Sequence, residues 1–191
     1  QCLVGSEMCI RDRGFTVQVA LQAVLNPPAE GKKEKKHGDF SFRIGDRVMQ
    51  IRNNYDIMWK RADGLGAGTG IFNGDIGCIT QIDFQQETMT VQFDEKTAEY
   101  SFDMLSELEP AYAMTVHKSQ GSEFPVVILP MSWFPPVLAT RSLLYTAVTR
   151  GKEDVVIVGN PQYMNGMVDN NRSKSRNSGL KARIVGMCGL M

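Results

Sequence analysis

Residues 126–130 read Val-Val-Ile-Leu-Pro, and residues 155–158 read Val-Val-Ile-Val. Both runs are apolar throughout and have the length of a strand. Between them, a helix beginning near Thr140 and capped by Gly151 is predicted by the spacing of Leu143, Leu144, Ala147 and Val148. A strand, a helix and a second apolar strand are typical of a βαβ unit in a parallel sheet covered on both faces. This part of the chain therefore predicts an α/β fold, of which the pattern supplies only part of a domain.

Upstream of this unit, residues 40–105 have the pattern of an all-β segment. Short strand-like runs alternate with turn signals such as Asn-Gly and Asp-Glu-Lys, a spacing that predicts a small barrel or sandwich. The expected strands are Arg47–Arg52, Gly77–Phe84, Met89–Phe93 and Ala98–Phe102. The glycine-rich stretch 63–70 lacks the Gly-Lys-Ser/Thr ending of a phosphate-binding loop, so it is interpreted as a hairpin tip.

Four shorter segments complete the expected organisation. The Asn-Pro-Pro sequence at 26–28 ends a predicted amphipathic helix, whose apolar face comprises Val17, Ala20, Leu21, Val24 and Leu25. The lysine-rich stretch Glu30–His37 is predicted to be a solvated loop, with a DNA-facing loop as the alternative. Met114–Gln120 is expected to form a helical turn and Pro161–Val168 a helix.

Composition excludes several classes of protein. Of the 191 residues, 42% are hydrophobic and 22% are charged, values typical of a globular protein rather than a disordered one. No apolar run approaches the length of a membrane-spanning helix. Lys+Arg and Asp+Glu both total 21, so any binding to nucleic acid depends on a local patch. The four cysteines are scattered, which excludes a zinc ribbon or disulfide framework and favours a reducing cytoplasm.

Residues 1–13, Gln-Cys-Leu-Val-Gly-Ser-Glu-Met-Cys-Ile-Arg-Asp-Arg, show neither a helical nor a strand period. They have neither the basic nor the apolar region of a signal peptide. We interpret them as a non-native leader resembling translated sequencing-adapter sequence, joined near Gly14 to a natural sequence whose upstream part is lost. A disordered natural terminus is the alternative.

The first candidate site lies in residues 111–124, just before the first apolar strand. Hydroxyl, ammonium and imidazole groups are concentrated there in Thr115, His117, Lys118, Ser119 and Ser122. Such donors suit phosphate oxygens, and a strand–loop junction of an α/β sheet is a common place for a ligand. The residues alone also fit a polar helix cap, with His117 as an ordinary surface histidine.

The second candidate site is Leu-Leu-Tyr-Thr-Ala-Val-Thr-Arg at 143–150. Arg150 follows the predicted helix, where a cation gains about 0.3–1 kcal/mol from the helix dipole. It also fits an arginine directed at the γ-phosphate of a nucleotide, a role worth roughly 10³–10⁵ in rate. The residue types do not separate the two interpretations.

Together the two segments resemble motifs V and VI of superfamily 1 DNA helicases. Tyr-Ala-Met-Thr-Val-His-Lys-Ser-Gln-Gly-Ser-Glu-Phe at 112–124 is similar to motif V, and residues 143–150 are similar to motif VI. Phe-Arg-Ile-Gly-Asp-Arg-Val-Met at 42–49 and Phe-Asn-Gly-Asp-Ile-Gly at 72–77 resemble the RecD-like branch of the superfamily. The resemblance covers roughly residues 14–186.

The resemblance implies an ATP-driven motor that moves 5′ to 3′ on single-stranded DNA. It implies a partial RecA-like parallel-sheet domain of the P-loop NTPase type, interrupted by a small β-barrel of the Src-homology type. The implied divisions are a leader at 1–13, the start of the second RecA-like lobe with a linker at 14–44, the barrel at 45–108, the remainder of the lobe at 109–168 and a polar, basic tail at 169–191.

The resemblance also implies roles for particular residues. Arg150 matches the catalytic arginine that contacts the γ-phosphate, and Gly121 and Glu123 match the other ATP-binding positions. The DNA-binding positions are matched by Thr115, His117, Lys118 and Ser119, with weaker candidates in the barrel at Asn53, Asn54 and Tyr55. Tyr145 and Thr149 are expected to support motif VI without touching a ligand.

The implied cofactor is ATP with magnesium, yet the chain has no GxxxxGK[ST] and no acidic magnesium-binding segment. Both belong to the N-terminal RecA-like lobe, which is therefore an expected partner, along with single-stranded DNA and duplex junctions. The chain alone is expected to be inactive. No metal site and no membrane contact are predicted, and the expected location is the bacterial cytoplasm, in association with the nucleoid.

Two other interpretations remain. The helicase part of a conjugative relaxase shares motifs V and VI, and an N-terminal nuclease with a histidine cluster would distinguish it. A stand-alone module, in which the barrel binds DNA or a protein, belongs to a different class, and the neutral net charge favours a protein partner. Against such a module, Arg150 and Glu123 keep the spacing found in motors.

Overall fold

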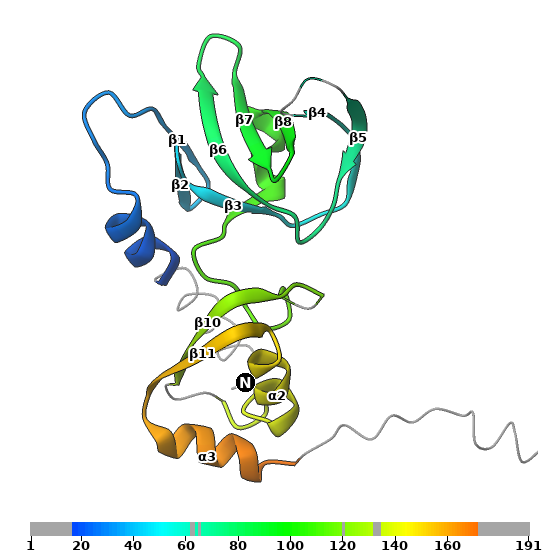
Figure 1. Ribbon diagram of the computed structural model, residues 1–191. Coiled ribbons are helices and arrows are strands. Elements are labelled where there is room, and N and C mark those ends of the chain that lie inside the picture. The colour runs from blue at the N-terminus through cyan, green and yellow to red at the C-terminus, as the bar shows by residue number, and fades with distance from the viewer. Residues whose placement is uncertain (1–16, 62–63, 65, 120, 132–134, 172–191) are drawn as a thin grey trace, which may run out of the picture. The chain divides into compact units, whose positions relative to one another are not determined.

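The computed structural model describes residues 17–61, 64, 66–119, 121–131 and 135–171. The chain divides after Ser122 into two compact units, called here the barrel unit and the parallel-sheet unit (Figure 1). The leader expected at 1–13 and all but the first residues of the tail expected at 169–191 lie outside the described residues.

The barrel unit is built on a curved seven-stranded antiparallel sheet with the strand order β5-β4-β8-β7-β6-β3-β9 (Figure 1). Its strands are β3 (Arg47–Gln50), β4 (Asn54–Arg61), β5 (Ala67–Ile71), β6 (Ile76–Asp83), β7 (Thr88–Phe93), β8 (Lys96–Ser101) and β9 (Leu108–Pro110). The short 3-10 helix η1 (Phe102–Glu107) joins β8 to β9. Inward-facing side chains from the strands form one core cluster, which includes Val48, Ile57, Ile71, Ile79, Val91 and Tyr100.

The four strands expected in this region are confirmed as β3, β6, β7 and β8. The sequence analysis missed β4 and β5, which pair antiparallel, and β5 includes residues 67–70 of the glycine-rich stretch that had been interpreted as a hairpin tip. Polar and glycine residues interrupt the alternation of apolar and polar side chains in both strands, so the hydrophobic pattern does not indicate them. The pairing also shifts register between Asn54 and Met58. A hairpin tip at this stretch is consistent with the hydrogen bond from Arg61 N to Gly66 O at 2.8 Å.

The solvated loop expected at Glu30–His37 is wrong for its second half. Residues Glu34–His37 form β1, which pairs antiparallel with β2 (Phe40–Arg43). Glu34 forms an ion pair with Arg43 on the facing strand, and the Lys35 ammonium lies 4.1 Å from the centroid of the Phe102 ring. Charged side chains therefore stabilise this hairpin, and a hydrophobic pattern could not have indicated it.

Residues 17–25 are helical, as predicted, but the expected packing face is wrong. The exposed fractions of Val24 and Leu25 are 77% and 64%, whereas those of Gln22 and Asn26 are 7% each. The face that packs on the barrel is the polar one, spaced four residues apart as Gln18, Gln22 and Asn26. A buried carboxylate explains this inversion.

The buried carboxylate belongs to Asp46, which is 1% exposed and directly precedes β3. Its oxygens accept hydrogen bonds from Gln22 Nε2 at 2.6 Å, from the backbone N–H of Arg43 at 2.7 Å, from Tyr112 Oη at 2.8 Å and from Asn26 Nδ2. Gly45, with a φ of +90°, allows the tight turn that places Asp46 there. The network joins the N-terminal helix, the β2–β3 turn and the segment that follows β9.

The parallel-sheet unit contains β10 (Phe124–Met131), α2 (Arg141–Val148), β11 (Gly151–Gly159) and α3 (Pro161–Asp169). Strands β10 and β11 pair in parallel, α2 and α3 pack on each other, α2 contacts β11 and α3 contacts β10. Thr140 caps α2 by accepting a hydrogen bond from Leu143 N, as the expected start requires. The predicted βαβ unit and the α/β class are confirmed.

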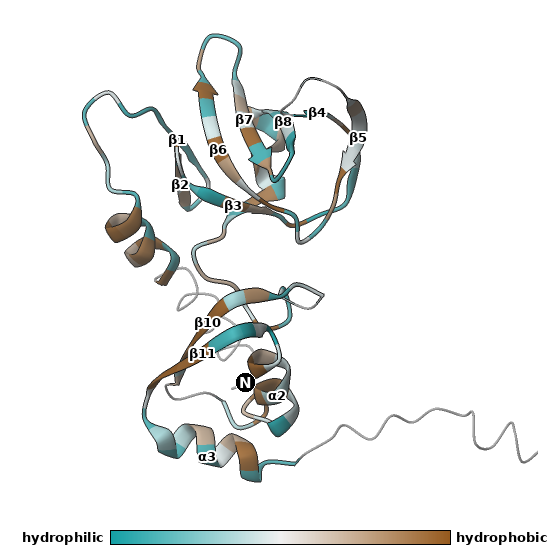
Figure 2. Ribbon diagram, in the orientation of Figure 1, coloured by the Kyte–Doolittle hydropathy of each residue, from teal (hydrophilic) through white to brown (hydrophobic). Residues whose placement is uncertain are grey.

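Two expectations for this unit are wrong. Both strands carry hydrophobic runs (Figure 2), but these runs are only partly covered: Leu129 and Met131 are buried, whereas Ile128 is 65% exposed, and Ile157 and Val158 are 42% and 55% exposed. The apolar run had indicated cover on both faces, which this two-stranded sheet does not have. Gly151 is not a helix cap, because α2 ends at Val148 with Thr149 as its C-cap and Gly151 is the first residue of β11.

We predict that Asp46→Ala destabilises the barrel unit by about 2–4 kcal/mol, because it leaves several buried donors without an acceptor. Urea denaturation followed by circular dichroism measures the change. Glu99→Ala, which removes an exposed carboxylate from β8, is the control and should alter the free energy of unfolding by less than about 0.5 kcal/mol. Equal effects of the two substitutions would contradict the role given to Asp46.

Candidate functional site

An open cleft in the barrel unit brings the first candidate segment next to a barrel turn. Its volume is about 560 Å³. One wall is the β5–β6 turn, Asn73-Gly74-Asp75, and the other comprises His117, Lys118, Gly121 and Ser122. The cleft thus places two DNA-binding candidates and one ATP-binding candidate from the sequence analysis beside a turn that was not among the candidates.

The segment leading into the cleft is held by the side chain of Gln18. Its Nε2 donates to Pro110 O at 2.7 Å and also to Ala113 O. Its Oε1 accepts from the backbone N–H groups of Tyr112 at 2.9 Å and Ala113 at 3.0 Å. One amide therefore satisfies both donors and acceptors of a backbone segment that has left the sheet, and so fixes its path.

Residues 116–119 form a turn closed by a backbone hydrogen bond between Ser119 and Thr115, four residues apart as in an α-helix, so the helical turn predicted within Met114–Gln120 is present, while Gln120 lies outside the described residues. Thr115 Oγ1 accepts from Lys118 N at 3.3 Å, and Ser119 N donates to Thr115 O at 3.1 Å. Ser119 is buried and its hydroxyl donates to Val116 O at 2.8 Å. Gly121 has a φ of +86°, a conformation that a side chain would strain.

His117 and Lys118 are exposed at the cleft. The Lys118 ammonium forms an ion pair with the carboxylate of Glu109 on β9. The side chains of Lys118 and Glu109 are 38% and 35% exposed, so this contact is open to solvent. Lys118, which the resemblance to helicases assigns to DNA binding, therefore has a carboxylate partner in the same unit.

The opposite wall is anchored to the barrel core through Gln50. Its backbone accepts from Gly74 N and donates to Asp75 O, both at 2.9 Å, and its side chain bridges the Tyr100 hydroxyl and the Glu107 carboxylate. Burial, and secondarily the negative charges nearby, raise the pKa of the Tyr100 phenol, which keeps it a hydrogen-bond donor.

The weaker barrel candidates also take part in this anchoring. Asn53 Oδ1 accepts from Asn73 N at 2.9 Å, and Asn54 Nδ2 donates to Glu107 at 3.0 Å. Tyr55 is 64% exposed and packs edge-on against Phe72, with the ring centroids 5.6 Å apart. Asn53 is therefore the candidate in direct contact with a residue that lines the cleft.

The ATP-binding candidates Glu123 and Arg150 lie together in the parallel-sheet unit. Glu123 immediately precedes β10, and Arg150 immediately precedes β11. The two strand starts are paired, because Phe124 N donates to Arg150 O at 2.8 Å and Phe124 is in register with Gly151. Glu123 forms an ion pair with Lys152 at 3.3 Å, and Arg150 Nε donates to Thr146 O at 3.3 Å. Thr149 donates to the same Thr146 carbonyl, whereas Tyr145 is 70% exposed.

Both residues lie at the amino ends of the parallel strands. The general rule for α/β sheets places ligands beyond the carboxyl ends of the strands, so it supports neither a site here nor the expected one at residues 115–122, which also precede β10. What the arrangement offers is a guanidinium, an ammonium and a carboxylate at one edge of a two-stranded sheet. The guanidinium and the ammonium suit a phosphate group, whereas the carboxylate does not.

The described residues contain no group of three or more His, Cys, Asp or Glu side chains that could hold a metal ion. Within the same part of the chain, no helix has the length and hydropathy needed to cross a membrane.

Sequence reasoning missed Glu109, Asp46, Asp75 and Gln18. The Gly-Asp pair at 45–46 and the i, i+4, i+8 spacing of Gln18, Gln22 and Asn26 are signals that could have found the Asp46 network. No local pattern indicates Glu109, since its role depends on a turn nine residues further along the chain.

Comparison with known families gives two matches. Residues 19–93 match the SH3 domain of ATP-dependent RecD-like DNA helicases, and residues 110–158 match the UvrD-like helicase C-terminal domain. The first match covers most of the seven-stranded sheet, and the second covers the segment after β9 together with β10, α2 and most of β11.

Individual relatives agree with these matches. The chain is 33% identical over 133 residues to the ATP-dependent RecD2 DNA helicase of Deinococcus radiodurans, covering 70% of this chain and 16% of the relative. It is 42% identical over 80 residues to the RecBCD enzyme subunit RecD of Mycobacterium tuberculosis, covering 42% of this chain and 14% of the relative. The chain thus spans a small part of the length of either relative.

Among solved structures, a Pif1 helicase studied for the unwinding of forked duplex DNA has a similar fold. The TM-score is 0.50 at 19% identity, over 91% of this chain and 41% of that one. This likeness supports the arrangement of elements.

We predict that the Tyr112 phenol titrates above the ordinary value of 10.0, because burial and its hydrogen bond to Asp46 raise its pKa. The difference in ultraviolet absorbance between the wild type and Tyr112→Phe isolates this titration. The stability that the neutral phenol supplies should be present in full below the ordinary pKa and lost as the pH rises through the raised one. A titration midpoint at the ordinary pKa of tyrosine would show that the Tyr112 phenol does not donate a hydrogen bond to Asp46.

Proposed function

We propose, from the premise that this chain belongs to the RecD-like superfamily 1 helicases, that it is the C-terminal part of an ATP-dependent DNA helicase. Such a protein couples ATP hydrolysis to movement along single-stranded DNA and to duplex unwinding. The observation that carries the proposal is the presence of a RecD-like SH3 domain and a UvrD-like C-terminal domain in one chain. We place the parent protein in the bacterial cytoplasm, at the nucleoid where its DNA substrate lies.

The cleft of the barrel unit is the proposed contact with single-stranded DNA. Lys118 and His117 present an ammonium and an imidazole at its exposed wall, while Thr115 and Ser119 shape the turn that carries them. Asn53 holds the facing turn through Asn73. A phosphate contact by Lys118 fixes the strand without reading its sequence, as a translocating motor requires.

The amino edge of the parallel sheet is the proposed contact with the nucleotide. Arg150 directs its guanidinium from the end of α2, and its bond to the Thr146 carbonyl fixes the direction of the side chain. ATP with magnesium supplies the phosphoryl group that reacts. The role of Arg150 is to stabilise the negative charge that grows on that group. Glu123 and Lys152 form an ion pair at the same edge of the sheet.

The described residues suit only one side of such a nucleotide, because they include an arginine but no cluster of metal ligands. The phosphate-binding lysine and the magnesium ligands are assigned to an N-terminal RecA-like lobe, the partner of this one. The 191 residues alone should therefore not hydrolyse ATP.

In the full-length parent, Arg150→Ala should lower the rate of ATP hydrolysis by about 10³-fold or more while leaving the fold intact. DNA-stimulated phosphate release measures the rate, and circular dichroism checks the fold. Arg141→Ala removes an arginine from the other end of the same helix and should leave the rate nearly unchanged. Near-normal turnover by Arg150→Ala would exclude the catalytic role.

In the 191-residue chain, Lys118→Ala should weaken binding of single-stranded DNA to a similar degree for all sequences. The slope of log affinity against log salt should become shallower by about 0.7, the value for one lost phosphate contact on a single strand. Fluorescence anisotropy with oligothymidine and a mixed-sequence strand measures both. Lys60→Ala, on an exposed position of β4, is the control. An unchanged slope would remove Lys118 from the DNA contacts.

A further inference from the structure

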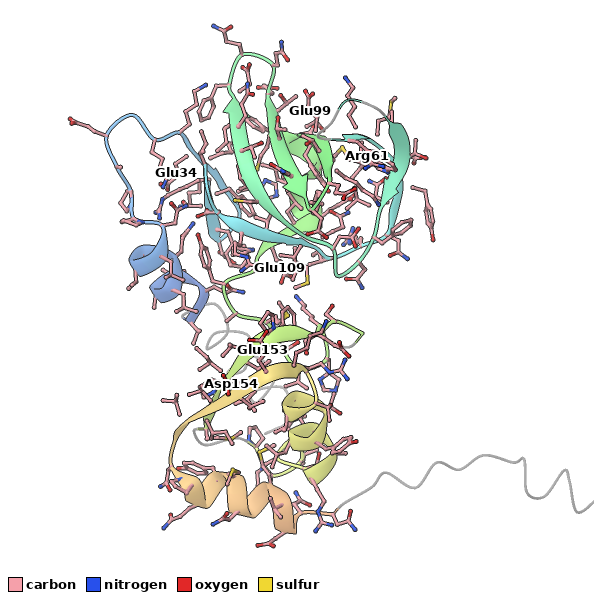
Figure 3. The ribbon with its side chains drawn as sticks, viewed as in Figure 1. Glu34, Arg61, Glu99, Glu109, Glu153 and Asp154 are labelled. Atoms are coloured by element: carbon pink, nitrogen blue, oxygen red, sulfur yellow. The ribbon has the colours of Figure 1, made fainter. Side chains whose placement is uncertain are left out.

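Glu109 is in a position to control the proposed DNA contact of Lys118. It is the middle residue of β9, paired in register with Met49 of β3, and its neighbours Leu108 and Pro110 are buried. The carboxylate therefore projects from a fixed strand. Figure 3 labels Glu109 at the end of the barrel unit from which the chain leaves the sheet.

Lys118, in contrast, lies in a turn held by short-range contacts, the hydrogen bond from its own N–H to Thr115 Oγ1 and that from Ser119 N to Thr115 O. Its long side chain reaches back to Glu109, and the contact is a third exposed on both sides. Exposed ion pairs of this kind contribute little to stability, so Lys118 can exchange its carboxylate partner for another anion at small cost.

The other charged or titratable groups at the cleft are His117 and Asp75. Asp75 Oδ2 is engaged by the backbone N–H of Phe72 at 2.9 Å, within its own turn. Among the described groups, Glu109 is thus the carboxylate that contacts the Lys118 ammonium. A phosphate approaching that ammonium meets the charge of Glu109 at close range and is repelled by it.

We propose that Glu109 competes with a DNA phosphate for the Lys118 ammonium and so keeps the affinity of the cleft for single-stranded DNA low enough for release. The proposal rests on the proposed function, in which Lys118 contacts the strand. In the absence of DNA, Glu109 neutralises Lys118 and holds it oriented. When a strand binds, the phosphate displaces or shares that partner, and when the strand leaves, Glu109 takes the ammonium back.

Glu109→Gln tests the charge while keeping an oxygen that can accept from Lys118. Oligothymidine binding to the 191-residue chain should tighten about three- to tenfold at low salt, while the salt slope should stay near that of the wild type, because Lys118 neutralises the same single phosphate in both. Glu99→Gln removes the same charge from an exposed position of β8, far from Glu109 in Figure 3, and should change neither quantity appreciably.

The double variant Glu109→Gln/Lys118→Ala separates competition from general electrostatics. If Glu109 acts through Lys118, the double variant should bind as weakly as Lys118→Ala alone. A gain of the same size with and without Lys118, or no gain in Glu109→Gln, would overturn the competition while leaving the proposed function intact. Failure of every variant and of the wild type to bind DNA would contradict the proposed function, and this proposal with it.

Discussion

The barrel unit depends on one buried charge. The carboxylate of Asp46, nearly inaccessible to solvent, must be satisfied by hydrogen bonds, because an unpaired charge in a protein interior is costly. The donors come from the N-terminal helix, from the turn before β3 and from Tyr112. The same helix fixes the segment after β9 through Gln18. A constraint in the barrel thereby sets the path of the chain into the cleft where the DNA-binding candidates lie.

This arrangement turns the N-terminal helix over, so that its polar stripe packs inward and its apolar stripe faces outward. The parallel-sheet unit has a comparable surplus of exposed apolar side chains on β10 and β11. Both surfaces are chemically suited to burial against further protein. They agree with a chain that spans only a small part of the helicases it resembles.

Sequence reasoning was sufficient where the spacing of the hydrophobic residues matches the period of a strand or a helix. The apolar runs of β10 and β11 and the capped helix between them gave the βαβ unit, and the alternating runs gave four strands of the barrel. Sequence reasoning failed where polar contacts between residues distant in the sequence determine the structure. These cases are the charged hairpin β1–β2, the inverted helix face and the Glu109–Lys118 pair. The placement of Arg150 beside Glu123 needed the register of two strands, which the motifs imply but local spacing does not supply.

The central claim is that this chain serves a DNA motor, and a strand-separation assay on the full-length parent tests it most directly. The substrates are duplexes with a single-stranded tail at the 5′ or the 3′ end of one strand. We predict that the 5′-tailed duplex is unwound only when ATP and magnesium are present, and that the 3′-tailed duplex stays intact. Binding of either duplex without ATP-dependent separation would contradict it.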